Sequence, residues 1–426
     1  MIFKAVLVFA LLFIIMLNGS PMAVALGAAT AITLLTTTSL GATTIATACF
    51  SGLDSFPLLA VPFFILAGNL MRFGGLSQKI LDFADALVGH ITGALGMVSV
   101  VACMFFAALS GSSPATVSAI GSMTIPEMEK QGYDKGYATA LNAAAGTIGV
   151  IIPPSIPFVI YGVVANTSIA DMFKAGVLPG ILIGLALMVV NYIEVKKNGY
   201  GMAHKENKKF SGKKLIATLK ETWLALMVPV IILGGIYAGI FTPTESAVVG
   251  IVYTLIIGTF VYHELNRETI YAALRDSVLV NGQTMFLVGF SMGFARFLTM
   301  SQIPATIAKS ISGIESKVLV FLMINIFLLI VGCFIDNISS MLILTPIFLP
   351  IVQNFGMSTV QFGIVMTVNL CIGFVTPPYG ANLFIASAIA DVPIINIAKK
   401  IIPMIFAMLA VLMMLTFIPV LSTFAL

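Results

Sequence analysis

The sequence predicts an all-α polytopic membrane protein made of two inverted-topology repeats, each with a re-entrant helical hairpin and a broken helix. Three observations predict this fold. Hydrophobic residues make up 59% of the 426 residues and charged residues only 9%, whereas a soluble domain carries about 25% charged residues. A Pro-Pro step occurs twice in matching apolar surroundings, and a strongly basic segment separates the two copies.

The composition leaves room for little besides membrane helices. The mean hydropathy is +1.09, and a chain of this length allows roughly a dozen spans of about 20 residues. The first apolar run, residues 2–17, passes directly into more apolar sequence, so we expect a retained first span rather than a signal peptide. The partner expected from composition is the lipid bilayer, with no nucleic acid. The cysteines show no CxxC pairing and are expected to be small buried hydrophobes (Cys49, Cys103, Cys333 and Cys371).

The first Pro-Pro step, Pro153-Pro154, lies inside the apolar segment that begins at Gly149. Proline has no N–H and its ring clashes with the carbonyl four residues earlier, so the step frees the carbonyls of Gly149 and Val150. Unpaired carbonyls at membrane depth are tolerated only inside protein or along a cavity, where they can bind a hard cation. The sequence therefore predicts a broken helix over about 136–166 and a transporter.

The second Pro-Pro step, Pro377-Pro378, lies 224 positions after the first and frees the carbonyls of Gly373 and Phe374 in the same way. It predicts a second broken helix over about 358–390. The same offset relates three further pairs of residues, which are Pro126 and Pro350, Gly132 and Gly356, and Pro179 and Pro403. We therefore expect a first repeat over 1–195 and a second over 222–426.

The segment 196–221 is the long polar stretch of the chain and carries eight lysines. Basic loops remain on the cytoplasmic side of a membrane, so we expect a cytoplasmic linker here. The remaining connections then place sixteen of the 21 Lys and Arg residues inside, four outside and Arg296 within a span. This assignment puts both chain ends outside and gives the two halves opposite orientations across the membrane.

Two polar clusters interrupt apolar runs that are too short to span a bilayer comfortably on their own. The first cluster extends from Ser110 to Thr116, and its counterpart extends from Asp336 to Ser340. Each predicts a re-entrant hairpin with a polar tip at mid-membrane, over about 93–130 and about 316–355.

Each hairpin tip is expected to face the broken helix of its own half and to bind Na⁺ with hydroxyl, amide, carboxylate and carbonyl oxygens. The alternative is that the small residues serve close helix packing. The predicted sodium ligands are Ser110, Ser112, Ser113, Gly149 and Ile152 in the first half, and Asp336, Asn337, Gly373 and Thr376 in the second.

Arg296 lies well inside an apolar run, where a charged residue usually faces a cavity or a partner. It is suited to hold a substrate carboxylate in a bidentate pair. The alternatives are that it extends to the membrane surface or pairs with Asp336. Glu245, in Thr242-Pro-Thr-Glu245, fits a capping box at a helix start instead of an intramembrane functional carboxylate.

The chain resembles the large membrane subunit of tripartite ATP-independent periplasmic (TRAP) transporters, the DctM-like family. The segments that resemble this family are Ser110-Gly-Ser-Ser-Pro-Ala-Thr-Val-Ser-Ala-Ile-Gly121, Gly149-Val-Ile-Ile-Pro-Pro-Ser155 and Thr242-Pro-Thr-Glu-Ser246. The resemblance implies location in the bacterial inner membrane, no enzymatic activity, and sodium-driven uptake of a small carboxylate by an elevator mechanism.

The resemblance also implies two protein partners, a periplasmic substrate-binding protein and a small four-helix membrane subunit, which we expect to be a separate chain. The overall likeness favours the sialic acid branch, with C4-dicarboxylates next, although the binding protein in this family supplies much of the selectivity. The expected substrate contacts are Arg296, Asp336, Ser155 and Tyr379.

Three other functions remain open from the sequence. A stand-alone sodium/carboxylate symporter with the same inverted hairpins would need no binding protein. A channel is less consistent with two closed hairpin tips. An intramembrane enzyme is disfavoured, since the spans contain no His-rich metal motif and no nucleophile and base pair.

Overall fold

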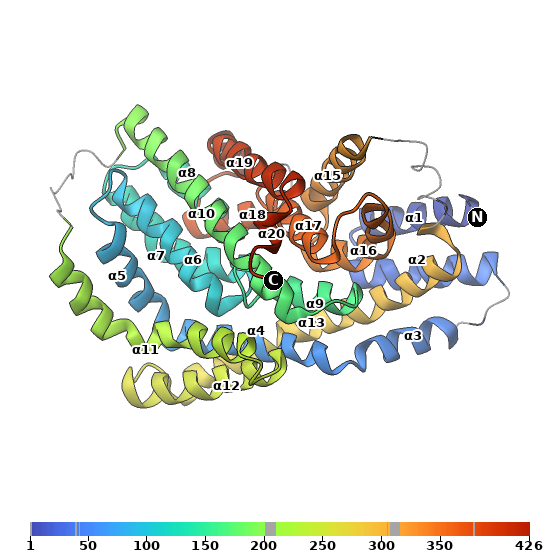
Figure 1. Ribbon diagram of the computed structural model, residues 1–426, viewed down its shortest axis with the longest axis horizontal. Helices are drawn as coiled ribbons and strands as arrows, with labels where there is room; N and C mark the ends of the chain where they lie inside the picture. The colour runs from blue at the N-terminus through green and yellow to red at the C-terminus, as the bar shows by residue number, and fades with distance from the viewer. Residues whose placement is uncertain are drawn as a thin grey trace.

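The computed structural model describes residues 2–38, 41, 43–200, 210–304, 306, 316–377 and 380–426, and within these ranges all regular structure is helical (Figure 1). Eight of the described helices are long and apolar enough to cross a membrane, judged by length and composition. The all-α membrane fold expected from the sequence is therefore confirmed.

The first half contains ten helices within the described residues and two short 3₁₀ segments. In chain order they are α1 (Ile2–Leu17), α2 (Met22–Thr37), α3 (Thr43–Leu53), η1 (Phe56–Leu59), α4 (Ala60–Phe73), α5 (Leu76–Val88), α6 (Ala94–Ser110), α7 (Ser113–Lys130), α8 (Lys135–Gly146), η2 (Thr147–Val150), α9 (Ile156–Val164) and α10 (Ile169–Asn198).

The second half repeats this order at nearly constant distance along the chain. Its described helices are α11 (Gly212–Tyr237), α12 (Pro243–Ile256) with the π-helical turn η4 (Ile257–Val261), α13 (Arg267–Met300), α15 (Lys317–Phe334), α16 (Asn337–Asn354), α17 (Thr359–Gly373), α18 (Ala381–Ala390), α19 (Ile394–Phe417) and α20 (Val420–Thr423).

Helix boundaries follow the offset of 224 residues. Shifted by that number, α7 covers the same positions as α16, and α6 begins one residue from the start of α15. The clearest difference is that α3 and α4 are separated in the first half, whereas α13 is one helix of 34 residues. Proline explains it: Pro57 and Pro62 occur in the first copy, and Asn281 and Phe286 occupy the equivalent positions of α13.

Both predicted hairpins are present. Helix α6 ends at Ser110, and Gly111 then adopts the left-handed conformation (φ 59°) that reverses the chain. Ser112 caps α7, with Pro114 in the first turn. In the second hairpin Ile335 is extended and Asp336 caps α16.

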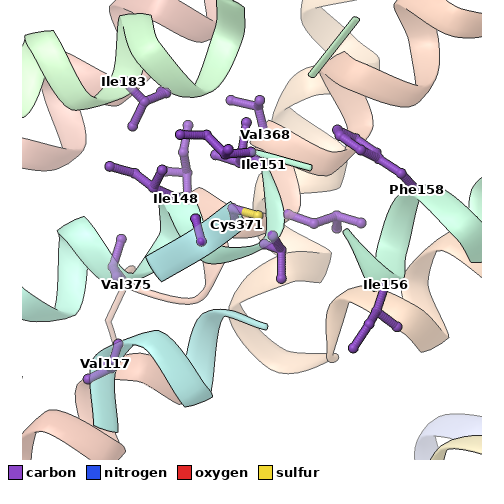
Figure 2. Close-up of a cluster of buried hydrophobic side chains, with 14 of the residues drawn as sticks. Val117, Ile148, Ile151, Ile156, Phe158, Ile183, Val368, Cys371 and Val375 are labelled. Carbon is purple, nitrogen blue, oxygen red and sulfur yellow. The ribbon is translucent and has the colours of Figure 1, made fainter. Parts of the chain in front are cut away.

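Both predicted helix breaks are present as well. The chain leaves helical geometry between η2 and α9, and again between α17 and α18. Figure 2 shows the surroundings of the first break, where Ile148, Ile151 and Phe158 gather in one buried apolar cluster with Val368 and Cys371 of the second broken helix. The two interruptions therefore share one core near the centre of the molecule.

The halves pack on each other reciprocally. Helix α18 of the second half packs against α7 and α8 of the first, and α9 packs against α16 and α17. Likewise α19 packs against α8, and α10 against α17. We call α6–α9 and α15–α18 the central helices, and α1–α4 with α11–α13 the outer helices; in Figure 1, α11, α12, α13 and α3 run along the lower edge.

Helices extend into both ends of the expected linker. Helix α10 continues to Asn198, with Lys196 and Lys197 in its last turn, where cations complement the helix dipole. Helix α11 begins at Gly212 behind the cap Ser211. The expected linker 196–221 is therefore partly helical, because helices of 30 and 26 residues are longer than the hydrocarbon layer requires. The predicted capping box of Thr242 and Glu245 is confirmed.

Candidate functional site

Three oxygen atoms and the backbone of Gly149 meet where the first hairpin tip contacts the first helix break. The Ser110 hydroxyl lies 3.0 Å from the Thr116 hydroxyl and 3.4 Å from the Ser112 carbonyl oxygen. The Thr116 hydroxyl donates to that same carbonyl at 2.8 Å. Gly149 approaches so closely that a Cβ built on it would lie 2.6 Å from the Ser112 carbonyl oxygen and would also overlap the Thr116 hydroxyl. Only glycine permits this approach.

The tip is fixed to the non-helical segment that follows. The Ile156 N–H donates to the Gly111 carbonyl at 3.4 Å. A Cβ on Gly111 would lie 2.7 Å from the Pro154 carbonyl oxygen. The backbone of the hairpin tip therefore packs directly against the backbone of the helix break. Ser110 and Thr116 are buried at this junction.

Most of the carbonyls that the prolines were expected to leave without a hydrogen bond do accept one. Within the described ranges no hydrogen bond to the Gly149 carbonyl is found, as predicted. The Val150 carbonyl, however, accepts from the Ser155 hydroxyl at 2.6 Å. The carbonyls of Gly373 and Phe374 accept from the N–H groups of Thr376 and Asn382 at 3.1 and 3.0 Å. The expectation of four free carbonyls was wrong for these three, because neighbouring side-chain and backbone donors reach them.

The second hairpin tip carries buried polar atoms without a partner. Among the described residues, the Asn337 side-chain oxygen and the Ser340 hydroxyl have no hydrogen-bond partner. The Asn337 amide nitrogen lies 3.5 Å from the Cys371 sulfur. Asp336 is exposed at the tip, where its carboxylate accepts from the Ser339 N–H at 3.0 Å and from the Ser339 hydroxyl. Buried polar atoms normally have partners. The second tip therefore offers two oxygens that are open to a further hydrogen bond or ligand, as are several other buried atoms of the described chain, Thr254 and Ser291 among them.

The remaining predicted ligands of the second half lie close to this tip. The Thr376 hydroxyl donates to the Ile372 carbonyl at 2.7 Å. Gly373 contacts Gly332 of α15 directly, and a Cβ on Gly373 would overlap the Gly332 backbone. The second hairpin and the second broken helix therefore meet at a pair of glycines.

Ser113 contacts the opposite half of the molecule. Its hydroxyl lies 2.7 Å from the amide nitrogen of Asn382 and 3.1 Å from the amide oxygen. The same Asn382 nitrogen donates to the Ala143 carbonyl of α8 at 3.0 Å. Both Ser113 and Asn382 are fully buried. Asn382 thus links the first hairpin tip, the first broken helix and, through its own N–H, the second break at Phe374.

Arg296 lines a cleft of about 750 Å³. Within the described part of the chain its guanidinium group forms no ion pair, and no pairing with Asp336 is found. Two outer helices, α3 and α13, supply most of the lining. The rest comes from Val163 and Val164 at the end of α9 and from Pro346 of α16. The cleft therefore lies between outer and central helices.

The other expected substrate contacts are placed differently. Ser155 is fully buried; its hydroxyl bonds the Val150 carbonyl and accepts from the Phe158 N–H at 3.4 Å, so it braces the first break. Ile152 is buried against α10, where its side chain covers Gly180. Tyr379 lies outside the described residues.

Three residues of these junctions were missed by sequence reasoning as site residues. Thr116 was noted only as part of a polar cluster, although its position four residues after Ser112 places its hydroxyl over that carbonyl. Ser340 carried no signal beyond its place in the second cluster. Asn382 carried none, because its partner Ser113 is 269 positions away.

Comparison with known proteins identifies the family. Residues 9–421 match the family described as tripartite ATP-independent periplasmic transporter, DctM component. The chain belongs to the DctM family. As a DctM component it is a multi-pass protein of the bacterial inner membrane and a transport protein, not an enzyme.

Individual relatives of this DctM component are named for different substrates. The C4-dicarboxylate TRAP transporter large permease protein DctM of Pseudomonas aeruginosa is 41% identical over 93% of this chain and 92% of its own length. The sialic acid TRAP transporter large permease protein SiaM of Vibrio cholerae is 38% identical over 91% of this chain and 90% of its own length. The isethionate TRAP transporter permease protein DctMQ of Oleidesulfovibrio alaskensis is 46% identical over 95% of this chain, which spans only 64% of that relative.

A solved structure supports the fold of the DctM component. The YdaH transporter of Alcanivorax borkumensis, whose crystal structure is described as having an unusual topology, superposes with a TM-score of 0.64 over 89% of both chains at 14% identity. At this identity the likeness concerns the fold alone.

Proposed function

We propose that this DctM component imports a carboxylate-bearing solute into the cell and that sodium ions drive the import. A periplasmic binding protein delivers the solute, and a separate small four-helix membrane subunit completes the transporter. The family description as one component of a tripartite system supports these partners. The relatives' names support a small organic anion as the solute, since they include sialic acid, C4-dicarboxylates and isethionate.

The first sodium ion binds where the first hairpin tip meets the first break. Its ligands are the hydroxyls of Ser110 and Thr116 and the carbonyls of Ser112 and Gly149. The separations of 2.8–3.4 Å among the first three oxygens support this assignment, because oxygens that hold a hard cation at about 2.4 Å lie about that far apart. The pairing of the neighbouring Val150 carbonyl with Ser155 leaves Gly149 as the carbonyl available for the ion.

The second sodium ion binds at the second tip, with Asn337, Ser340 and the carboxylate of Asp336 as ligands. The support is that the Asn337 oxygen and the Ser340 hydroxyl are buried without partners. A bound cation would supply the missing interaction for both oxygens at once. The adjacent carboxylate adds the negative charge that the first tip lacks.

Hairpin and broken helix move together as one body in an elevator mechanism. A buried polar pair joins them in each half. Ser99 of α6 donates to the Asn142 side-chain oxygen of α8 at 2.6 Å, and Asn369 of α17 donates to the Asn325 side-chain oxygen of α15 at 2.7 Å. Such buried pairs resist separation, so the boundary where sliding occurs lies between central and outer helices.

The solute binds in the cleft at Arg296, with its carboxylate on the guanidinium group. Sialic acid remains the first expectation and C4-dicarboxylates the next. Asp336 and Tyr379 remain further candidates for contact, whereas Ser155 is buried away from the cleft and braces the first break. The observation that carries the whole proposal is the close grouping of three oxygens at the first hairpin tip together with the two unpartnered oxygens at the second.

Reconstitution tests the proposal. The permease, its small subunit and its binding protein are placed in liposomes, and uptake of radiolabelled carboxylates is measured with an inward sodium gradient or with potassium in its place. Uptake should require sodium, and Thr116→Val and Asn337→Ala should each reduce it at least about tenfold. Thr30→Val is the matched control, because Thr30 is also buried and its hydroxyl bonds only its own helix at Leu26. Equal uptake in potassium would overturn the sodium coupling.

A further inference from the structure

Helix α11 lies at the edge of the molecule and leaves one of its faces bare (Figure 1). Its inner face packs against α5 and α12 and buries Thr222, Val228 and Ile232. Residues of the bare face, which we call the α11 strip, recur at alternating steps of three and four, so they form one row along the helix. The strip consists of Lys213, Ile216, Lys220, Trp223, Met227, Val230 and Gly234, all exposed except the half-buried Met227.

The polarity of the α11 strip changes at one level. Lys213 and Lys220 carry positive charge in its first part, and from Trp223 onward the strip is apolar. Tryptophan is enriched where the headgroups of a membrane meet the hydrocarbon layer. The strip therefore has the same order of layers as one leaflet of a bilayer, with charge at the headgroup level and an apolar surface below it.

The two lysines of the strip are available to an anion. Within the described chain neither Lys213 nor Lys220 forms an ion pair, whereas Lys214, on another side of the helix, pairs with Asp85 of α5 at 2.7 Å. Glu221 follows Lys220 in the sequence, but it points about 100° away around the helix and lies off the strip. An anion on the strip would thus meet two uncompensated cations.

The sequence around the strip adds to this charge. Residues 196–221 contain eight lysines and two acidic residues. A polybasic segment directly beside a membrane helix is the pattern that attracts anionic phospholipid headgroups. A zwitterionic headgroup has no net charge to offer, so charge complementarity favours an anionic lipid over a neutral one.

The apolar part of the strip suits acyl chains better than a partner helix. Helices associate inside membranes mainly through interhelical hydrogen bonds or closely spaced small residues. Between Trp223 and Gly234 the strip presents neither, since its side chains there are Met227 and Val230. An added Cβ at Gly234 would meet no atom within 4 Å, so that end of the strip is open to a flexible chain.

We infer that the α11 strip binds an anionic phospholipid. The phosphate lies on Lys220, Lys213 supplies the second positive charge, and an acyl chain follows Trp223, Met227 and Val230. The two lysines are two helical turns apart, about 10 Å along the axis, which two long side chains can bridge to one headgroup. This lipid site is independent of the proposed solute and sodium sites, because it uses none of their residues.

Trp223 makes the site directly measurable. It is the single tryptophan of the chain, and 51% of its surface is exposed. A bromine atom on a lipid acyl chain quenches tryptophan fluorescence on contact, so quenching of the full chain in nanodiscs reports lipid bound at this position alone. The two probes are brominated phosphatidylglycerol diluted into phosphatidylcholine and brominated phosphatidylcholine diluted into phosphatidylglycerol.

Brominated phosphatidylglycerol should reach half-maximal quenching at a mole fraction at least about fivefold lower than brominated phosphatidylcholine. One cation near an anionic headgroup contributes about 1 kcal/mol, which corresponds to about fivefold in affinity. Salt at about 0.5 M should reduce this preference, since it screens exposed charges. Equal quenching by the two lipids at low salt would overturn the inference.

Variants test the role of the lysines. Lys220→Gln should reduce the preference for the anionic lipid at least about threefold, and the double variant with Lys213→Gln should abolish it. Lys399→Gln is the matched control: it removes the same charge from an exposed position on α19, which packs against α8 and α10, and should keep the wild-type preference. A preference that survives the double variant would overturn the assignment of the headgroup to these lysines.

The other possible occupant of the strip is the small membrane subunit. Quenching is therefore repeated with that subunit in the same nanodiscs, and the signal of the Trp223→Phe complex is subtracted to remove the subunit's own fluorescence. Quenching by the anionic lipid should be unchanged. Loss of quenching by both lipids in the complex would place the subunit on the strip and overturn the lipid site.

Discussion

Asn382→Ala should destabilise the protein strongly, because this one side chain joins the two halves. Its amide nitrogen lies 2.7 Å from the Ser113 hydroxyl and 3.0 Å from the Ala143 carbonyl oxygen, in fully buried surroundings. Alanine would leave a buried hydroxyl and a buried carbonyl without this partner, at about 1–3 kcal/mol each. The hydroxyl can rotate toward another acceptor, so we expect a total loss of about 2–4 kcal/mol.

The assay is thermal unfolding of the purified full chain in detergent at a fixed scan rate. Asn198→Ala is the matched control: it removes the same side chain from an exposed position, where it bonds Glu194 of its own helix, and should change stability by less than about 0.5 kcal/mol. The double variant with Ser113→Ala should lose less than the sum of the two single losses. An Asn382→Ala protein that melts like the wild type, or strict additivity with Ser113→Ala, would refute the reasoning.

Three further outcomes are expected. Gly149→Ala should lower the free energy of unfolding by about 1–3 kcal/mol and abolish the stabilising effect of sodium, because its Cβ would meet the Ser112 carbonyl. The control is Gly234→Ala, where the added methyl group meets nothing within 4 Å and should be neutral or stabilising. Sodium at 100 times its dissociation constant should stabilise the wild type by about 2.7 kcal/mol in a melting titration, and Asn337→Ala should show a smaller shift; an undiminished shift would exclude Asn337 as a ligand. Arg72→Ala should cost less than about 1 kcal/mol, an effect that fades in high salt, because its ion pair with Asp276 at 2.7 Å is partly exposed.

The fold was predictable because its helix breaks occur at proline and glycine, which have strong preferences for particular backbone conformations. The Pro-Pro steps and the tip residues Gly111 and Pro114 act through backbone geometry, which depends on few neighbours. Pro57 acts in the same way between α3 and α4, and the residue 224 positions later, Asn281, leaves α13 uninterrupted. The division into repeats at 1–195 and 222–426 with a linker between them remains a prediction.

The candidate site was predictable only in part. Polar residues at the tips indicated where oxygens gather, and the glycine of the first break, Gly149, indicated a close approach. What a single sequence does not contain is which donors reach which acceptors across the fold. The Phe374 carbonyl is satisfied by the N–H of Asn382, and Ser113 by the side chain of the same residue, through contacts that exist only once the halves are packed.

The exchange of α9 and α18 between the halves bears on how such a chain arose. A single ancestral copy would leave the surface covered by this short helix bare, unless a second, oppositely inserted molecule supplied it. The ancestor implied by the packing is thus a dual-oriented pair of identical chains. Phe158 and Asn382 now occupy equivalent positions, one apolar and one polar. Identical subunits cannot differ in that way, so at least one of these two positions changed after the copies diverged.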